Sequence, residues 1–123
     1  MLINYEEITK ELTPQEKNVI YPLIIAGLQR HHGKKQAITG TEICNAINNK
    51  LPEAKLTGPR LRKIIQAIRI SGDLYNICST SNGYFVAATH KEIDECIESL
   101  QQRIDQQQRI VDALTWQKKQ QVK

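Results

Sequence analysis

Long apolar runs are missing from this sequence. No stretch approaches the ~20 apolar residues of a membrane span, and the N-terminus has no apolar run of signal-peptide length. Aromatic residues are also scarce, at 5% of the 123 residues, whereas apolar residues of all kinds reach 40%. This composition is enough for one small core, so we expect a single domain with room for one extension.

Cysteine is rare as well, and the three cysteines lie far apart at Cys44, Cys78 and Cys96. An odd number without a close pair argues against both a disulfide framework and a zinc site. The surrounding patterns predict helices for Cys44 and Cys96 and a strand for Cys78, which is typical of small buried side chains. Unpaired cysteines fit a reducing, cytoplasmic location.

Catalytic and cofactor motifs are absent from the sequence. Ser71, Ser79 and Ser81 stand in no nucleophile-elbow sequence. There is no phosphate-cradling glycine loop and no metal-spaced cluster of His, Asp or Glu. His31 and His32 are adjacent, so on a helix they would point in different directions and make a poor metal pair. We therefore expect a non-enzyme with no catalytic residues, metal or cofactor.

What the sequence does have is positive charge in one block. The net charge is +4, but residues 13–72 hold ten Lys or Arg against three Glu, a net charge of +7. Residues 1–12 and 73–88 are slightly acidic, and residues 89–123 are balanced. Such an asymmetry is typical of an electrostatic footprint for an anionic partner.

The centre of the basic block is a predicted helix over residues 57–72. Pro59 suits its first turn, and Gly72 is placed to end it in a left-handed conformation. One side carries an apolar stripe made of Leu61, Ile64, Ile65 and Ile68. The other side and its flanks carry Pro59, Arg60, Arg62, Lys63, Gln66 and Arg69. A face of cations and amides without a carboxylate suits DNA, although a surface helix can also be basic without a partner.

Two helices are predicted before this one, each beginning at a capping box. Thr13 and Glu16 begin the first, whose stripe is Val19, Ile20, Leu23, Ile24 and Leu28, and Pro22 should kink it. Thr39 and Glu42 begin the second, which runs from Gly40 to about Asn49 and buries Ile43, Ala46 and Ile47. Residues 1–12 are expected to form an arm packed on this body.

After Gly72 the period changes to that of strands. Leu74–Cys78 and Tyr84–Ala87 read as two strands joined through Asn82-Gly83, a strong hairpin signal. Three helices followed by a hairpin is the order of a winged helix-turn-helix domain. We therefore predict a mainly α fold with a small β-hairpin, the winged-helix domain covering residues 13–88.

The last predicted helix begins at a third capping box, Thr89 with Glu92, and runs without Gly or Pro to the C-terminus. Its apolar residues form a heptad seam of Ile93, Ile97, Leu100, Ile104, Val111 and Leu114, interrupted by Gln107. A helix this long cannot lie wholly against a small body. We expect residues 89–123 to form a homodimer, the alternatives being a solvated tail helix or a helix folded back along the first one.

A series of short motifs runs from the third helix into the last. It consists of Arg62-Lys63-Ile64-Ile65, Ile68-Arg69, Gly72, Cys78-Ser79, Asn82-Gly83-Tyr84 and Ile97-Glu98-Ser99-Leu100. Together these resemble small winged-helix proteins encoded by bacteriophages and prophages, over roughly Leu12 to Ile104. The resemblance implies a three-helix body, a short wing and DNA binding. It implies no catalytic residues and supplies no operator.

The functional expectation is a DNA-binding protein, of the phage or prophage regulator or replication-accessory type, that reads duplex DNA with helix 57–72. The expected DNA contacts are Lys34, Lys35, Lys55, Arg60, Arg62, Lys63, Gln66 and Arg69. The wing tip over residues 80–82 has no Lys or Arg, so it offers hydroxyl and amide contacts only. The alternative is a winged-helix interaction module that docks an acidic protein.

Overall fold

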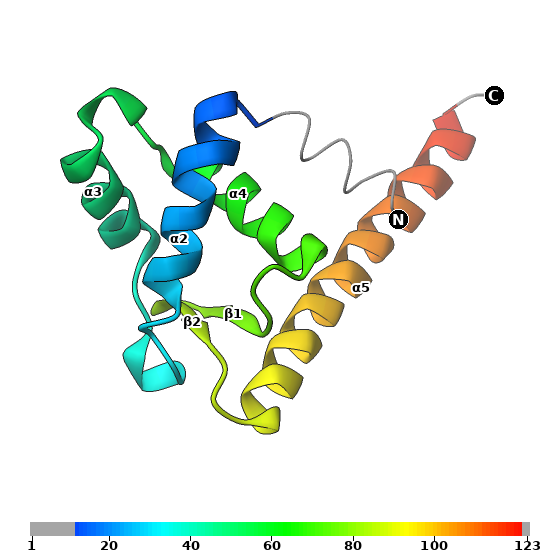
Figure 1. Cartoon of the computed structure of the whole chain (residues 1–123). Helices are drawn as coiled ribbons and strands as arrows, with labels where there is room; N and C mark the ends of the chain where they lie inside the picture. The colour runs from blue at the N-terminus through cyan, green and yellow to red at the C-terminus, as the bar shows by residue number, and fades with distance from the viewer. Residues whose placement is uncertain (1–11, 122–123) are drawn as a thin grey trace.

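The computed structural model of the protein describes residues 12–121. This part of the chain is mainly helical, with a two-stranded antiparallel hairpin and a long C-terminal helix (Figure 1). None of its helices is both long enough and apolar enough to cross a membrane. The predicted arm over residues 1–12 lies outside the described residues, except for Leu12, which is buried.

The first helix has two segments, a π-helical η1 (Glu16–Ile20) and α2 (Tyr21–Leu28). Its capping box is confirmed, because the Thr13 N–H donates to Glu16 Oε1 at 2.8 Å and the Glu16 N–H donates to Thr13 Oγ1 at 3.1 Å. The Tyr21 N–H donates to the Glu16 carbonyl, one residue farther than in an α-helix. The irregularity expected from Pro22 therefore takes the form of a π-helical turn just before it.

The buried side of this helix follows a spacing of four residues, at Leu12, Glu16, Ile20, Ile24 and Leu28. The predicted stripe was wrong at Val19, which is 40% exposed. A π turn contains more residues than an α turn, so every fourth position stays on one side and Val19 is rotated off it.

The second helix is α3 (Gly40–Lys50), and its predicted capping box is complete. It buries Ile43, Cys44 and Ile47, whereas Ala46, expected in the core, is exposed. The connector contains a 3-10 turn, η3 (Pro52–Ala54). The Asn48 side chain holds the end of this connector through two hydrogen bonds to Leu56. The Leu56 N–H donates to Asn48 Oδ1 at 2.7 Å, and Asn48 Nδ2 donates to the Leu56 carbonyl at 3.0 Å.

The central helix is α4 (Gly58–Ser71), and the predicted start, stop and apolar stripe are all confirmed. Gly72 ends it with φ of 77°, a conformation that glycine adopts without strain. Leu61, Ile64, Ile65 and Ile68 are each at most 1% exposed. This stripe belongs to the core, and α4 packs against both the first helix and α3.

The hairpin pairs β1 (Ile77–Thr80) with β2 (Gly83–Val86), Ile77 facing Val86 and Thr80 facing Gly83. Both strands differ from the expectation: β1 begins three residues later, and Ser81 and Asn82 form the turn, with Gly83 already in β2. Asn76, just before β1, has φ of 67° and so is not extended. On the other edge of β2, residues 31–38 run beside it. Ile38 and Tyr84 exchange two backbone hydrogen bonds of 2.9 and 2.8 Å, and the Gly33 N–H donates to the Val86 carbonyl.

The C-terminal helix α5 (His90–Gln121) has the predicted extent within the described residues. The Glu92 N–H donates to Thr89 Oγ1, as a capping box requires. The Glu92 carboxylate also accepts from the backbone N–H groups of Lys34 at 2.9 Å and Ala88 at 2.8 Å. It thereby ties α5 to η2 (Lys34–Gln36), and these hydrogen bonds hold the Glu92 pKa below its usual range.

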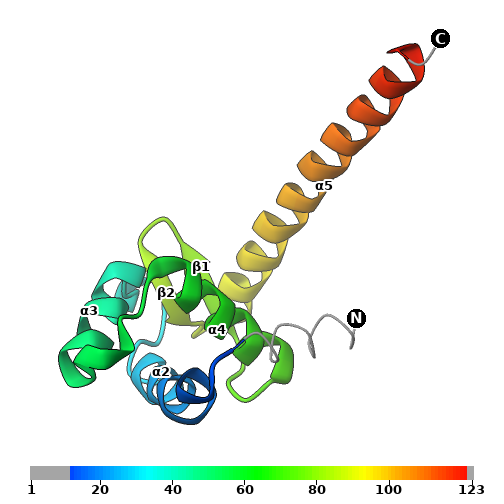
Figure 2. The same ribbon diagram turned by 90° about the horizontal axis from the view of Figure 1, so that it is seen from above.

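Beyond this first turn, α5 leaves the rest of the fold (Figure 2). It meets the hairpin along β1, and from Ile97 to Gln121 all of its residues are exposed. The alternative in which this helix folds back along the first helix is therefore not the structure of the single chain.

Gly83 generates the first prediction. Its φ is +123°, and a Cβ built there would lie 2.3 Å from the Ile38 carbonyl oxygen. Gly83→Ala should lower the free energy of unfolding by at least about 1–3 kcal/mol, because it adds backbone strain and a clash with backbone. Gly27→Ala is the matched control, since that glycine lies in α2 with nothing within 4 Å of its added Cβ. Urea unfolding followed by circular dichroism measures the stability of both variants. Equal stability of the two would contradict the prediction.

Candidate nucleic-acid interface

The exposed side of α4 carries Arg62 and Gln66, which are one helical turn apart. Lys63, between them in sequence, is half-buried. No residue of α4 is acidic, so this side of the helix has cations and amides only. The structure thus brings Arg62 and Gln66 together at the surface, as the sequence predicted.

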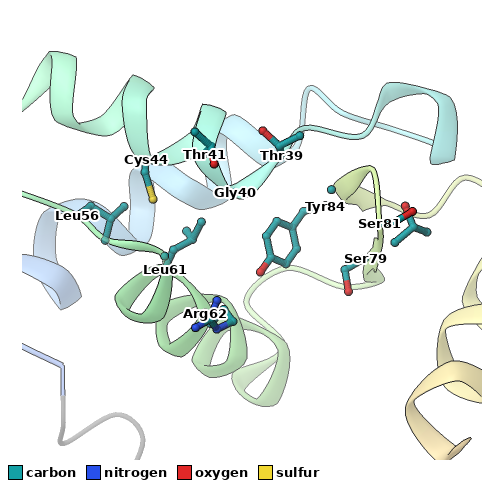
Figure 3. A pocket seen from close by; sticks show the side chains of 13 residues that line it. Thr39, Gly40, Thr41, Cys44, Leu56, Leu61, Arg62, Ser79, Ser81 and Tyr84 are labelled. Carbon is teal, nitrogen blue, oxygen red and sulfur yellow. The ribbon is translucent and has the colours of Figure 1, made fainter. Parts of the chain in front are cut away.

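Arg62 also borders an open depression of about 490 Å³ between α3, α4 and the hairpin (Figure 3). Its lining comprises Thr39, Gly40, Thr41, Cys44, Leu56, Gly58, Leu61, Arg62, Ser79, Thr80, Ser81, Gly83 and Tyr84. Tyr84 lies in the middle, with Thr41 on the α3 side and Ser81 on the hairpin side (Figure 3). The depression is therefore a place where three elements, far apart in sequence, present side chains to the same space.

Hydroxyl groups and one guanidinium dominate this lining, and none of the described residues that form it is acidic. Some hydroxyls are already engaged: Thr39 bonds with Glu42, and Ser79 accepts from Arg69. Arginine, serine, threonine and tyrosine are the side chains that commonly contact phosphate and sugar in protein–DNA complexes. The chemistry of the depression suits a phosphate backbone lying across it.

Sequence reasoning missed Thr41 and Tyr84 as members of this surface. Thr41 follows the capping residue of α3, and Tyr84 follows the Asn-Gly pair, so each was assigned only a local role. Their proximity depends on the pairing of β2 with Ile38, which places the hairpin beside the start of α3. No signal within either segment predicts that pairing.

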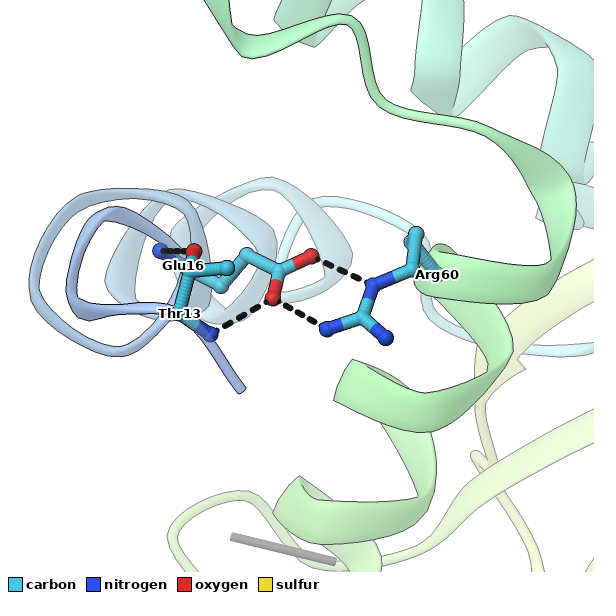
Figure 4. Close-up of polar contacts among 3 residues, drawn as sticks. All are labelled: Thr13, Glu16 and Arg60. Atoms are coloured by element: carbon cyan, nitrogen blue, oxygen red, sulfur yellow. Dashed lines mark hydrogen bonds and ion pairs between the residues drawn. The ribbon is translucent and has the colours of Figure 1, made fainter. Parts of the chain in front are cut away.

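Arg60, an expected DNA contact, is engaged inside the fold (Figure 4). Its guanidinium binds the Glu16 carboxylate with two groups, Nε donating to Oε2 at 2.9 Å and Nη2 to Oε1. Glu16 is only 6% exposed, and these bonds, foremost that from Arg60, hold its pKa below the ordinary value of 4.5. The pair fastens α4 to the first helix.

Arg69, also expected at the DNA, is engaged with the hairpin. Its Nε donates to the Ile77 carbonyl at 3.0 Å and its Nη2 to Ser79 Oγ at 3.4 Å. It therefore holds β1 against the end of α4. The hydrogen bonds of Arg60 and Arg69 thus hold α4 and the hairpin in place. Neither arginine is therefore among the DNA contacts that we propose.

The three expected lysine contacts are exposed but dispersed. Lys34 and Lys35 lie in η2, and Lys34 borders a crevice beside α5 that also holds Glu92 and Glu95. The hairpin residues Ser79, Thr80 and Ser81 line both this crevice and the first depression, so the hairpin separates Lys34 from Arg62. Lys55 follows η3 with φ of 48°, close in sequence to Leu56 and Gly58 at the other side of the depression.

The thiols of Cys44 and Cys78 are poor nucleophiles in this environment. Burial raises the pKa of Cys44, and burial together with the neighbouring Cys96 raises the pKa of Cys78 to about 12. A thiol with so high a pKa stays protonated at neutral pH, whereas the thiolate is the reactive form. Cys44 and Cys78 therefore pack as small apolar side chains, as predicted, whereas Cys96, also expected to be buried, is only half-buried.

The Glu16–Arg60 pair generates a prediction for pH. Because the pKa of Glu16 is lower in the folded than in the unfolded chain, the pair stabilises the fold above the unfolded pKa. That stabilisation is lost as pH falls through the folded pKa. Glu16→Gln should lower the free energy of unfolding at neutral pH by about 1–3 kcal/mol. The same substitution should also make the free energy of unfolding decrease less as the pH is lowered from neutral to acid.

Urea unfolding between about pH 3 and pH 7 measures this effect. Glu53→Gln is the control, because Glu53 is an exposed carboxylate on η3. If the Glu16 and Glu53 variants gave the same pH dependence, Glu16 would not be the stabilising group.

Comparison with known proteins leaves the function to be inferred from the chain itself. No protein-family model, curated protein or solved structure matches it.

Proposed function

We propose that this protein is a non-enzymatic, winged-helix DNA-binding protein that reads duplex DNA with α4. The order of elements supports the fold assignment: the first helix, α3, α4 and then the hairpin. The backbone pairing of residues 31–38 with β2 supports it further, because it holds the hairpin on the helical body. In this assignment the hairpin is the wing.

The observation that carries the proposal is the position of Arg62. It is exposed on a helix without carboxylates and borders the depression that α3 and the hairpin complete with hydroxyl groups. Arginine can bind guanine with two hydrogen bonds in the major groove, and glutamine, which is present one turn later as Gln66, can bind adenine in the same way. The hydroxyls of Thr41, Ser81 and Tyr84 would meet the flanking phosphates.

Electrostatic attraction would come from the exposed lysines of the basic block. Lys55 lies just before α4, whereas Lys34 and Lys35 lie in η2 on the other side of the hairpin, and such dispersed cations suit backbone phosphates, which lie several ångströms apart along the duplex. The hairpin tip has no cation, so it contributes polar contacts only. The main electrostatic contribution therefore falls on α4, on the connector before it and on η2.

The biological role we propose is that of a phage- or prophage-type regulator or replication accessory acting in the cytoplasm. It rests on the resemblance of residues Leu12 to Ile104 to such winged-helix proteins. DNA binding itself does not depend on this resemblance, because the arrangement of Arg62, Gln66 and the hydroxyl groups supports it separately.

The first test is the salt dependence of binding to a fluorescent duplex, measured by anisotropy. If about four or five phosphates are neutralised, log affinity should fall with log salt concentration with a slope of about −4, from roughly 0.9 per contact. A protein that fails to bind duplex DNA even at low salt, but binds an acidic protein, would be the interaction module of the alternative hypothesis.

The second test separates base reading from phosphate contact. Arg62→Ala should cost about 1–3 kcal/mol of binding free energy on the preferred duplex and should relax the preference at one base position. Lys35→Ala should weaken all sequences alike and lower the salt slope by about one. Sequencing of random duplexes retained by each variant measures the preference.

Arg109→Ala is the control for both variants, because Arg109 is an exposed arginine on α5, outside the proposed contact set. Its affinity and base preference should equal those of the unaltered protein. If Arg62→Ala behaved like Arg109→Ala, α4 would not be the reading helix.

A further inference from the structure

The part of α5 that leaves the fold carries a stripe of exposed apolar side chains. Ile97, Ile104 and Leu114 are each 59% exposed, Val111 is 54% exposed and Leu100 is 41% exposed. The segment from Ile97 to Gln121 extends about 37 Å at 1.5 Å per residue. The stripe itself runs from Ile97 to Leu114, about 26 Å, with one polar position at Gln107, and an exposed apolar stripe of this length is typical of an interaction site.

The identities along the stripe follow a heptad. Counting Ile97 as position a, the a positions hold Ile97, Ile104 and Val111, and the d positions hold Leu100, Gln107 and Leu114. β-branched residues at a combined with leucine at d favour a parallel pair of helices over trimers and tetramers. The seam ends at Lys118, the next a position, where a positive charge would meet its own copy.

From this pattern we propose that a second copy of this chain covers the stripe, in parallel and in register, through a two-stranded coiled coil of α5. The positions beside the seam favour a copy over an unrelated helix. The e positions hold Gln101, Gln108 and Thr115, and the g positions hold Arg103, Ile110 and Gln117. A coiled coil between two different chains usually selects the correct partner through complementary charges at the e and g positions. Here only Arg103 among the e and g residues is charged, so these positions do not repel a second copy of the chain.

The e-position amides are also ordered along the helix. Gln101 Nε2 donates to Asp105 Oδ1 at 3.0 Å, and Gln108 Nε2 donates to Asp112 Oδ1 at 2.8 Å. Each bond draws an amide towards a carboxylate at a b position, on the outward side of the seam. Since these side chains lie along the helix, they leave the a and d positions open to a facing helix.

The surface of α5 has the shape that such a partner requires. A shallow groove of about 550 Å³ is lined by Leu100, Arg103, Ile104, Gln107, Gln108 and Val111. These are the residues of two overlapping four-residue holes. The hole that begins at Leu100 would receive the partner's copy of Ile104, and the hole that begins at Ile104 would receive the copy of Gln107.

Gln107 determines the orientation of the pair. In a parallel, in-register dimer each d residue faces its own copy, so the two Gln107 amides can each donate to and accept from the other. In an antiparallel pair, d residues face a residues, and Gln107 would lie against isoleucine or valine with its amide unpartnered, which is costly in an apolar layer. A shift of one heptad would likewise place it against leucine.

The rest of the fold leaves room for this pairing. Cys96, Ser99 and Arg103 face the crevice beside the hairpin, so the fold lies on the c and g side of α5 and leaves the seam exposed. A parallel pair would place both folds at the same end of the coiled coil. If the proposed function holds, two α4 helices would then be available to one duplex, although the pairing itself does not require DNA.

Sedimentation equilibrium on the full chain tests the pairing. We expect a dimer of about 28 kDa, twice the 14.1 kDa of one chain. Gln107→Leu should tighten dimerisation by at least about tenfold, because it replaces a polar d residue with an apolar one, and Gln107→Glu should weaken it by at least about tenfold, because two like charges would meet. A chain that stays monomeric at high micromolar concentration overturns the proposal.

Gln102 provides the matched control, since it is an exposed glutamine at an f position on the opposite side of α5. Gln102→Leu and Gln102→Glu should leave the dissociation constant within about twofold of that of the unaltered chain. If the two Gln102 variants changed it as much as the Gln107 variants, residue 107 would not lie in the seam.

Orientation is measured by disulfide trapping. Leu114→Cys should form a covalent dimer on mild oxidation, because in a parallel, in-register pair position 114 faces its own copy. Ala113→Cys, at an outward c position, should form no more covalent dimer than the unaltered chain, which retains its three native cysteines. A dimer in which Leu114→Cys fails to cross-link is antiparallel or out of register and overturns the proposed geometry.

Discussion

The hydrogen-bonded pair of Glu16 and Arg60 sets the rotation of α4 about its own axis. Glu16 is the one buried charged residue among residues 12–121, so its carboxylate must be met by donors inside the fold. Thr13 supplies one donor, and Arg60, 44 residues later, supplies two. Successive residues of an α-helix are about 100° apart. With Arg60 turned towards the first helix, Arg62 lies about 200° away and faces outwards.

A second constraint positions the hairpin against that outward side. β2 is bonded on one edge to β1 and on the other to residues 31–38, and the close approach at Gly83 permits the second contact. Arg69 then fastens β1 to the end of α4. As a result, the hydroxyl groups of the hairpin and of the start of α3 lie beside Arg62. The proposed DNA surface is thus a consequence of contacts made by residues that do not belong to it.

The two parts of the C-terminal helix are stabilised by different interactions. Its first turn is held by Glu92, whose carboxylate accepts from Lys34 and Ala88 and so joins two loops to the helix start. Beyond Cys96 the helix makes its own backbone hydrogen bonds, but its apolar stripe has no counterpart within the described chain. Most of the stability of such a helix comes from packing its apolar stripe against another part of the protein or another chain. Dimerisation would supply that burial and would also bring together the two α4 helices proposed to read DNA.

Local patterns in the sequence were sufficient to predict the positions of the helices. The capping boxes at Thr13 and Thr39, the αL stop at Gly72, the buried stripe of α4 and the extent of α5 all depend on residues within a few positions of one another. The tertiary structure decided which basic residues are paired within the fold: Arg60 and Arg62 look alike in sequence, but only Arg60 meets a carboxylate 44 residues away. It also decided the strand boundaries, the exposure of Val19 and Ala46, and the partners of Glu92, because each depends on a segment distant in the chain. Periodicity determines which side of a helix is apolar, whereas only long-range packing determines what each polar side chain meets.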